Sequence, residues 1–197
     1  MKLYYSRGAC SLAAHIALAE AGVAFDSESV DLKTKRTAGD ADFNAVTSKG
    51  YVPAIVLEDG EVLTENIAVL DFLAGQFPQL GRGSGAIDRT RLLEALAFIS
   101  TEIHKSYKPF WRNGSDADKA AAADYIVKRM RYFADDLETD YLFGDTPGVA
   151  DFYLFVTLLW AEKFAIAAPA RLQAVYERLK ARPAVQKTLA AEGLRKA

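Results

Sequence analysis

Apolar residues in the first 80 positions follow two different spacings. Short runs with β-type alternation occur at residues 2–5, 25–32, 52–57 and 61–63. Helical runs occur at 11–21, which is followed by Gly22, and at 65–76. Asp59-Gly60 separates the last two strands and is a strong hairpin signal. The order of these elements predicts an α/β fold with one mixed sheet.

The remainder of the chain has helical spacing almost throughout. Leu92, Leu96, Ile99 and Ile103 form one apolar stripe, and His104 belongs to the stripe beside it. We expect further helices at 116–137, 148–165 and 170–180 and a short one after residue 183. A glycine-rich stretch at 81–86 interrupts the periodicity. The sequence therefore predicts a domain at 1–79, a linker at 80–86 and an all-helical domain at 87–197.

Composition narrows the class of protein. Of the 197 residues, 51% are hydrophobic and 25% are charged, as in globular proteins. The net charge of −2 gives no broad basic footprint, so we expect no nucleic-acid partner. The most apolar stretch, 152–161, is too short to cross a bilayer, and the N-terminus lacks a secretory pattern. We therefore expect a cytoplasmic protein without a membrane partner.

The single cysteine is the first candidate for chemistry. One Cys and two His residues are too few for a disulfide or a metal cluster, so we expect no metal. Cys10 lies between a predicted strand and a predicted helix, where the helix dipole lowers the pKa of a thiol. The alternative is a small buried residue. The hydroxyl of Ser11 either caps the helix, which we take as the default, or donates to a ligand thiolate.

Two further segments have the chemistry to bind a peptide. Val52-Pro53 precedes a strand, and a cis bond there would free the Val52 backbone to pair with an extended ligand, although trans is the more common geometry. Glu65 and Asn66 begin a helix, where Glu65 suits an ammonium group and Asn66 a carboxylate. A simple capping arrangement is the alternative for this pair.

Lys35 and His104 have more ordinary alternatives. Lys35 belongs to a small basic loop that either faces solvent or meets a second carboxylate. His104 is a proton carrier, a polar donor or a hydrogen-bonded residue of the core. Local sequence leaves both choices open.

Four motifs together are more specific than any one residue. They are MKLYYSRGACSLAAHIALAEAG at the start, KGYVPAIVLEDGEVLTENIAVLDFL, EIHKSYKPFW and GVADFYLF. The chain closely resembles the bacterial beta class of cytosolic glutathione transferases over nearly its whole length. The resemblance implies a thioredoxin-like N-terminal domain, an all-α C-terminal domain, glutathione as co-substrate and a homodimer.

The resemblance also implies roles for individual residues. Cys10 matches the cysteine characteristic of the class, and His104 the histidine that approaches it from the helical domain. Val52-Pro53 matches a cis-proline motif whose Val backbone pairs with the cysteinyl part of glutathione. Glu65-Asn66 falls on the pair that holds the γ-glutamyl head, and Lys35 on the lysine near the glycine carboxylate.

The sequence departs from the family pattern at three positions. Asn66 replaces the usual Ser, and its longer side chain shifts the expected reach to the ligand. Ala97 replaces a polar residue that in some relatives reaches the glutathione of the neighbouring subunit. Gly148 replaces the Ser or Thr that caps the buried helix, which leaves Asp151 without a hydroxyl partner at a cost of a few tenths of a kcal/mol.

The expected activity is conjugation of the glutathione sulfur to small hydrophobic electrophiles. Cys10, Ser11 and His104 would be the catalytic residues, and Tyr107, Phe110 and Trp111 would help to form the apolar pocket. One alternative is thiol–disulfide exchange through Cys10, which needs only one cysteine. The other is a non-enzymatic ligand-binding or assembly module.

Overall fold

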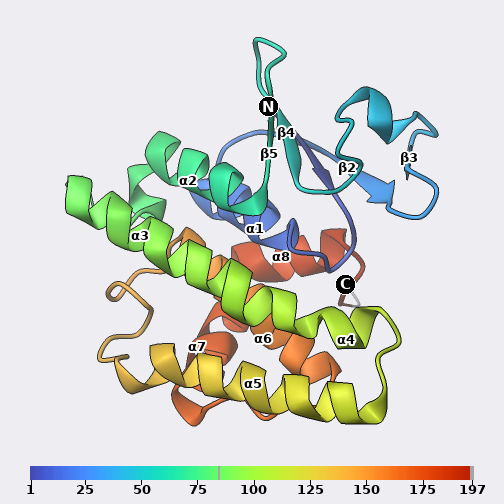
Figure 1. The fold of residues 1–197 in the computed structure, drawn as a ribbon. Helices are drawn as coiled ribbons and strands as arrows, with labels where there is room; N and C mark the ends of the chain where they lie inside the picture. The colour runs from blue at the N-terminus through green and yellow to red at the C-terminus, as the bar shows by residue number, and fades with distance from the viewer. Residues whose placement is uncertain (84, 196–197) are drawn as a thin grey trace.

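The protein, described here from a computed structural model that covers residues 1–83 and 85–195, has a small sheet beside a helical bundle (Figure 1). The sheet has the strand order β3-β2-β1-β4-β5. Its strands are β1 (Lys2–Tyr5), β2 (Asp26–Asp31), β3 (Arg36–Thr37), β4 (Ala54–Val56) and β5 (Val62–Thr64). The thioredoxin-like mixed α/β architecture expected for the first half is confirmed.

Strand pairing places β1 at the centre of the sheet. It runs parallel to β2 and antiparallel to β4, so that buried Leu3 pairs with Ser27 on one side and Ile55 on the other. The predicted hairpin joins β4 to β5, and Gly60 adopts the positive φ of 88° that its turn needs. The short edge strand β3 was not predicted, because two residues are too few to show alternation.

Two helices of the first half pack against the sheet and toward the bundle. Helix α1 (Leu12–Ala21) is rich in Ala and Leu, which favour helix, and ends at Gly22 with a left-handed φ of 70°. Helix α2 is Asn66–Gln76. Short 3-10 turns occur at Phe43–Ala45 and Pro78–Leu80.

The second half is all-helical, as predicted. Its α-helices are α3 (Ala86–Phe98), α4 (Lys108–Trp111), α5 (Asp116–Asp135), α6 (Val149–Lys163), α7 (Ala170–Ala181) and α8 (Pro183–Ala191). The stripe that contains Leu92 and Ile103 is buried, but it does not belong to one regular helix. A π-helical turn (Ile99–Ile103) and a 3-10 turn (His104–Tyr107) separate α3 from α4. The helical period therefore changes where His104 is presented.

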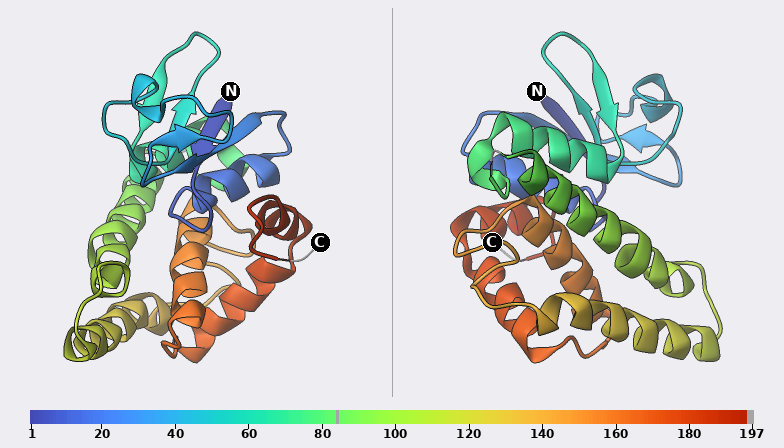
Figure 2. Two further views of the ribbon diagram at one scale, coloured as in Figure 1. Left: turned by 90° about the vertical axis from the view of Figure 1, so that its right-hand side faces the viewer. Right: turned by 60° about the vertical axis from the view of Figure 1, so that its left-hand side comes forward.

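Helix α6 is the centre of the molecule and is buried on nearly every side. Figure 2 shows it between α1 on the sheet side and the outer helices. One cluster of buried apolar residues runs from β1 through α1 and α2 into α6 and the bundle. The predicted linker at residues 80–86 begins at the last residue of the 3-10 turn and ends at the first residue of α3, and the division of the chain there stays a prediction. None of the described helices combines the length and hydrophobicity that a membrane crossing requires.

The start of α6 explains the glycine that replaces the usual Ser or Thr. A Cβ at Gly148 would lie 2.6 Å from the carbonyl oxygen of Leu80, so a side chain has no room there. The Asp151 carboxylate instead accepts hydrogen bonds from the backbone N–H groups of Gly148 at 2.9 Å and Leu142 at 2.8 Å. The absence of a hydroxyl thus follows from close packing of two backbones.

Candidate functional site

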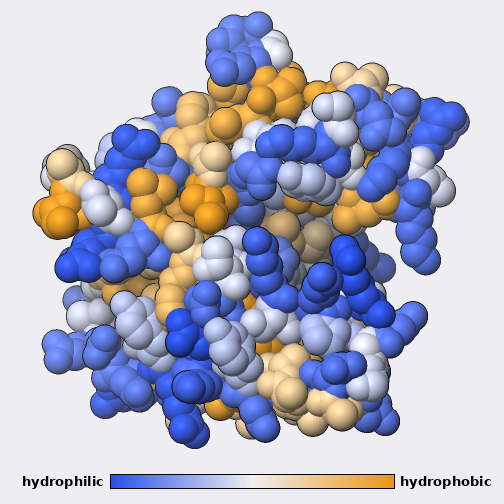
Figure 3. Space-filling view, viewed as in Figure 1, coloured by the Kyte–Doolittle hydropathy of each residue, from blue (hydrophilic) through white to orange (hydrophobic). Residues whose placement is uncertain are grey.

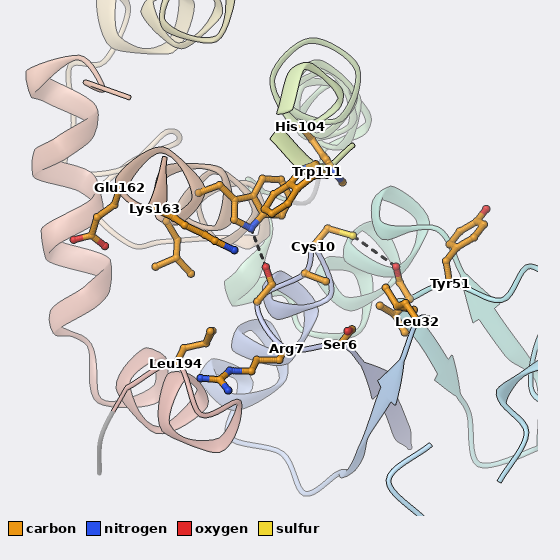
Figure 4. Close-up of a pocket in the computed structure, with 15 residues that line it drawn as sticks. Ser6, Arg7, Cys10, Leu32, Tyr51, His104, Trp111, Glu162, Lys163 and Leu194 are labelled. Carbon is orange, nitrogen blue, oxygen red and sulfur yellow. Dashed lines mark hydrogen bonds between the residues drawn. The ribbon is translucent and has the colours of Figure 1, made fainter. Parts of the chain in front are cut away.

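A cavity of about 880 Å³ opens between the sheet and the bundle (Figure 4). The β1–α1 turn forms its floor, the loop before β4 together with Leu32 forms one wall, and α4 and α6 form the other. The lining residues are Ser6, Arg7, Gly8, Ala9, Cys10, Leu32, Tyr51, Val52, His104, Trp111, Leu159, Trp160, Glu162, Lys163 and Leu194. Of the predicted site residues, the cavity thus brings together Cys10, Val52 and His104.

The turn that carries Cys10 is organised by Ser11. The Ser11 Oγ accepts from the Ser6 N–H at 3.2 Å and donates to the Ser6 carbonyl at 3.4 Å. The expected default role as helix cap is wrong, because the side chain makes no capping hydrogen bond and its backbone is already helical. Ser11 is fully buried and does not line the cavity. Its hydroxyl therefore shapes the turn rather than facing a ligand.

The Cys10 thiol lies against the wall formed by Val52. Its Sγ donates to the Val52 carbonyl at 3.6 Å. Burial raises the pKa of Cys10 to about 12, although the backbone N–H groups of Cys10 and Ser11 act in the opposite direction. The expected lowering of the thiol pKa is therefore wrong. Desolvation outweighs the helix N-terminus here, and Cys10 is a neutral thiol donor at pH 7.

Val52-Pro53 is a cis peptide bond, as the family resemblance implied. Both residues precede β4, which begins at Ala54, so the strand is shorter than predicted. Val52 is buried, lines the cavity and directs its carbonyl to Cys10. Pro53 does not line the cavity, and its contribution to the site is the shape of the backbone.

Glu65 and Asn66 begin α2 without the simple capping arrangement. Glu65 has a positive φ of 69°, and its half-exposed carboxylate accepts at Oε1 from Lys49 Nζ at 2.7 Å and from Tyr51 OH at 2.6 Å. Lys49 and then Tyr51 hold the pKa of Glu65 below its usual value. Neither Glu65 nor Asn66 lines the cavity itself.

Asn66 is unusual because its buried side-chain amide forms no hydrogen bond of normal geometry, although the Tyr153 hydroxyl lies close to it. Neither its Oδ1 nor its Nδ2 forms a hydrogen bond among the residues that the structure describes. A buried amide in this state costs about 1–3 kcal/mol relative to one that is paired. A buried amide without hydrogen bonds is what we expect of a residue that forms its hydrogen bonds with a bound ligand.

Lys35 lies apart from the cavity lining. Its φ is 58°, and its Nζ donates to the Gly50 carbonyl at 2.6 Å. Gly50 directly precedes Tyr51 and Val52 of the cavity wall. The ammonium group thus supports the loop before the cis bond, in addition to the role toward a carboxylate that the resemblance implied.

His104 is held by the bundle and is neutral at pH 7. Its Nδ1 is 2.7 Å from the hydroxyl of buried Tyr153, and its ring packs edge-on against Trp160. Burial, with a smaller effect of Lys105, lowers the pKa of His104 to about 4. Among the roles left open by the sequence, this environment favours a polar donor over a proton carrier near pH 7.

The wall opposite Val52 is aromatic and comes from α4 and α6. Trp111 lines the cavity as expected, with Lys163 Nζ 5.1 Å from its ring centre. Tyr107 and Phe110 do not: Tyr107 is buried with its hydroxyl on the Thr157 carbonyl, and Phe110 stacks on Phe164. These two expectations are wrong, because both rings pack within the bundle and not on the cavity.

Sequence reasoning missed several residues of the site. Trp160 was read only as part of a buried helix, yet its Nε1 donates to the Gly8 carbonyl at 2.8 Å. An indole within a strongly apolar run was the available signal, since buried Trp N–H groups need an acceptor. Leu159, Lys163 and Leu194 carried no such signal. The described residues contain no group of three or more His, Cys, Asp or Glu side chains suited to a metal ion.

Comparisons with known proteins agree with this arrangement. Residues 8–76 match the family "Glutathione S-transferase, N-terminal domain", and residues 101–192 match "Glutathione S-transferase, C-terminal domain". The chain is 39% identical to glutathione S-transferase GstA of Escherichia coli O157:H7 over 99% of this chain and 100% of that protein.

Solved structures give the same result. A sphingomonad glutathione S-transferase complexed with glutathione is 42% identical, with a TM-score of 0.91 over 99% of this chain and 100% of that one. A bacterial beta-class enzyme from Sphingomonas chungbukensis is 39% identical, with a TM-score of 0.88 over 99% and 100% of the two chains. The chain belongs to the glutathione S-transferase family.

Proposed function

We propose that this protein conjugates the sulfur of glutathione to small hydrophobic electrophiles. It is a transferase of the glutathione S-transferase family, with glutathione as co-substrate. The main support for the proposal is one cavity with three parts. Backbone at Tyr51 and Val52 that can pair with a peptide forms one wall, an aromatic wall lies opposite, and the neutral thiol of Cys10 lies at the base. The two walls suit the two substrates of a conjugation.

The first wall has the groups that an extended, anionic tripeptide needs. The Val52 backbone would pair with the cysteinyl unit, and the buried Asn66 amide would bind the α-carboxylate of the γ-glutamyl head. Glu65 uses only Oε1 for Lys49 and Tyr51, so Oε2 remains for the ammonium group. Lys35, whose ammonium group binds the Gly50 carbonyl, would bind the glycine carboxylate.

Catalysis follows from stabilising the thiolate of glutathione and holding the electrophile against it. Cys10 and His104 both lie on the cavity as neutral polar groups, and each is suited to donate a hydrogen bond to a sulfur anion. The thiolate then forms a C–S bond with the electrophilic carbon, and with an aryl halide the halide leaves. Trp111, Trp160 and Leu159 supply the apolar surface for that partner.

Thiol–disulfide exchange through Cys10 is the second candidate. Its support is the single thiol on the cavity lining. The raised pKa of about 12 argues against it, because the thiolate is the attacking species in exchange. A binding module without turnover is the third candidate.

A parallel assay separates the three. The purified protein is tested for retention on glutathione resin, for conjugation of a generic aryl halide and for reduction of a glutathione mixed disulfide. Retention with conjugation supports the proposal. Reduction without conjugation favours exchange, and retention without either reaction identifies a binding module.

Replacement of the thiol sharpens the choice. We expect Cys10→Ala to lower conjugation about tenfold or less, because one donor among several is lost. The same change should abolish mixed-disulfide reduction, because an attacking sulfur has no substitute. Loss of all conjugation while glutathione still binds would show that Cys10 has a larger part in the transfer.

The assembly and location of the protein are also part of the proposal. We infer a homodimer in the cytoplasm. Figure 3 shows apolar surface over α2 and the start of α3. Ile87 on α3 and Val62 on β5 are exposed hydrophobic residues. Ala97 is half-buried on α3, and nothing in the single chain explains its difference from polar relatives. Sedimentation at micromolar concentration should give twice the 21.5 kDa of one chain, and a species of 21.5 kDa alone would contradict the dimer.

A further inference from the structure

We propose that Glu192, close to the C-terminus, is a positioning residue that fixes the turn carrying Cys10. The inference rests on the proposed function, because it assigns a role in the same site. It arises from a buried carboxylate that none of the site residues discussed above uses. Glu192 belongs to the last turn after α8, 182 positions from Cys10 in the sequence.

Both carboxylate oxygens of Glu192 are engaged by the first half of the protein. Oε2 accepts the backbone N–H of Gly8 at 2.8 Å, and Oε1 lies 2.9 Å from Nδ1 of His15 on α1. Glu192 and His15 are each only 4% exposed. Taking a carboxylate out of water is costly, and here the cost is offset by one backbone amide and one imidazole.

The opposite side of the same residue is held as well. The Gly8 carbonyl accepts from Trp160 Nε1 at 2.8 Å, so both peptide groups of Gly8 are bound by residues of the helical half. Arg7 donates to the Gly193 carbonyl beside Glu192. Figure 4 shows Arg7 and Leu194 below Cys10. The β1–α1 turn is thus clamped between α6 and the end of α8.

The clamp acts on the geometry of the thiol. Gly8 has a positive φ of 66°, two residues before Cys10, and Leu194 would lie 3.3 Å from a Cβ at this position. If the turn moves, Cys10 Sγ leaves the Val52 carbonyl, and water reaches the thiol. A displacement of about 1 Å at a reacting group can cost up to about a hundredfold in rate.

An ion pair elsewhere on α1 provides a matched control. Arg182, between α7 and α8, binds Glu20 of α1 through two hydrogen bonds of 2.6 and 2.8 Å. This pair joins the same two parts of the molecule as Glu192 and His15, but it touches neither Gly8 nor the turn. If Glu192 had only a structural role, replacing Glu192 or Glu20 would have the same effect on Cys10.

The test compares Glu192→Ala, Glu192→Gln and Glu20→Ala in the full-length protein. The first readout is the alkylation rate of Cys10 by iodoacetamide, which reports this thiol alone because the chain has one cysteine. We expect Glu192→Ala to alkylate about tenfold faster and to lose about tenfold or more in kcat/KM for an aryl halide. Glu20→Ala should alkylate like the unchanged protein even if it is less stable.

The Gln variant tests the contacts rather than the charge. Its amide oxygen can accept from Gly8, and its amide nitrogen can donate to the His15 ring when Nδ1 is the acceptor, so both readouts should return to within about threefold of the unchanged protein. Equal alkylation rates in Glu192→Ala and Glu20→Ala would overturn the proposal. If Glu192→Ala does not fold, Trp160→Phe removes the other contact to Gly8, and an unchanged alkylation rate in that variant would also overturn it. Alkylation needs no glutathione, so this result stands apart from a failure of conjugation.

Discussion

Two helices of this protein begin in buried surroundings, and their first residues are used in opposite ways. At the start of α6, the Asp151 carboxylate binds the backbone N–H groups of Gly148 and Leu142, so the buried polar groups are paired internally. At the start of α2, the Glu65 backbone has a positive φ, no cap forms, and the Asn66 amide is buried without a partner. The paired end stabilises the fold, and the other end has the buried amide that we propose binds glutathione.

The pKa values of the carboxyl groups at the two helix starts are shifted in opposite directions. Burial raises the pKa of Asp151 to about 6, whereas Lys49 and Tyr51 lower the pKa of half-exposed Glu65. Asp151 therefore contributes most to stability below its unfolded pKa of 3.8, and that contribution falls as pH rises through about 6. The ionised Glu65 carboxylate contributes to stability above pH 4.5, and this contribution is lost as the pH falls through its lowered pKa.

Removal of the Asp151 carboxylate should have the largest effect. Asp151→Ala leaves two backbone N–H groups without an acceptor, and we expect a loss of about 3 kcal/mol or more in the free energy of unfolding by urea. Asp118→Ala is the matched control, since Asp118 caps α5 through Ser115 at an exposed site and should cost about 1 kcal/mol. Similar losses in both variants would contradict the importance of burial at α6.

Restoring the family hydroxyl at α6 should destabilise rather than help. In Gly148→Ser the new Cβ would meet the Leu80 carbonyl at 2.6 Å, and we expect a loss of about 2 kcal/mol in the same measurement. The reverse change at α5, Ser115→Gly, should cost only a few tenths of a kcal/mol. A stability gain in Gly148→Ser would show that Leu80 moves away easily.

The unpaired end of α2 should trade stability against binding. Asn66→Leu replaces an unsatisfied buried amide by an apolar group of similar size, so we expect about 1 kcal/mol of added stability without ligand. Glutathione affinity, measured by calorimetry, should fall about tenfold, or about 1.4 kcal/mol. A loss of stability without glutathione would mean that the amide is paired in solution.

The smallest effect concerns the exposed carboxylate beside Asn66. Glu65→Gln should lower stability by only a few tenths of a kcal/mol at pH 7, because Lys49 and Tyr51 bind it at the surface. Since the pKa of Glu65 is lowered in the folded protein, this difference should shrink as pH falls below 4.5. Urea unfolding at pH 7 and pH 4 measures it, and a difference that grows in acid would reverse the assignment.

Local sequence signals predicted most of the fold. Asp59-Gly60 and Gly22 mark a turn and a helix end through their own backbone preferences, and both predictions are confirmed. Edge strand β3 and the change of helical period around His104 have no comparable local signal. The predicted helix ends differ from the observed ones by one or two residues.

The site was harder to predict because its chemistry depends on contacts distant in sequence. The motif located Cys10, but the raised pKa of its thiol comes from burial by both halves of the chain. Ser11 was expected to cap its helix, and its hydroxyl is used by Ser6 instead. No spacing rule connects Gly8 to Glu192 or Trp160, since these pairs are 184 and 152 positions apart.

One apolar cluster joins the two halves of the chain, and this determines whether the first half can fold as a separate fragment. Residues of α1 and α2 bury their apolar faces against α6, so a fragment ending near residue 79 would expose that surface to water. Such a fragment would aggregate rather than fold independently, although its sheet is formed entirely from its own strands. We therefore expect the two parts of the chain to unfold as one cooperative unit.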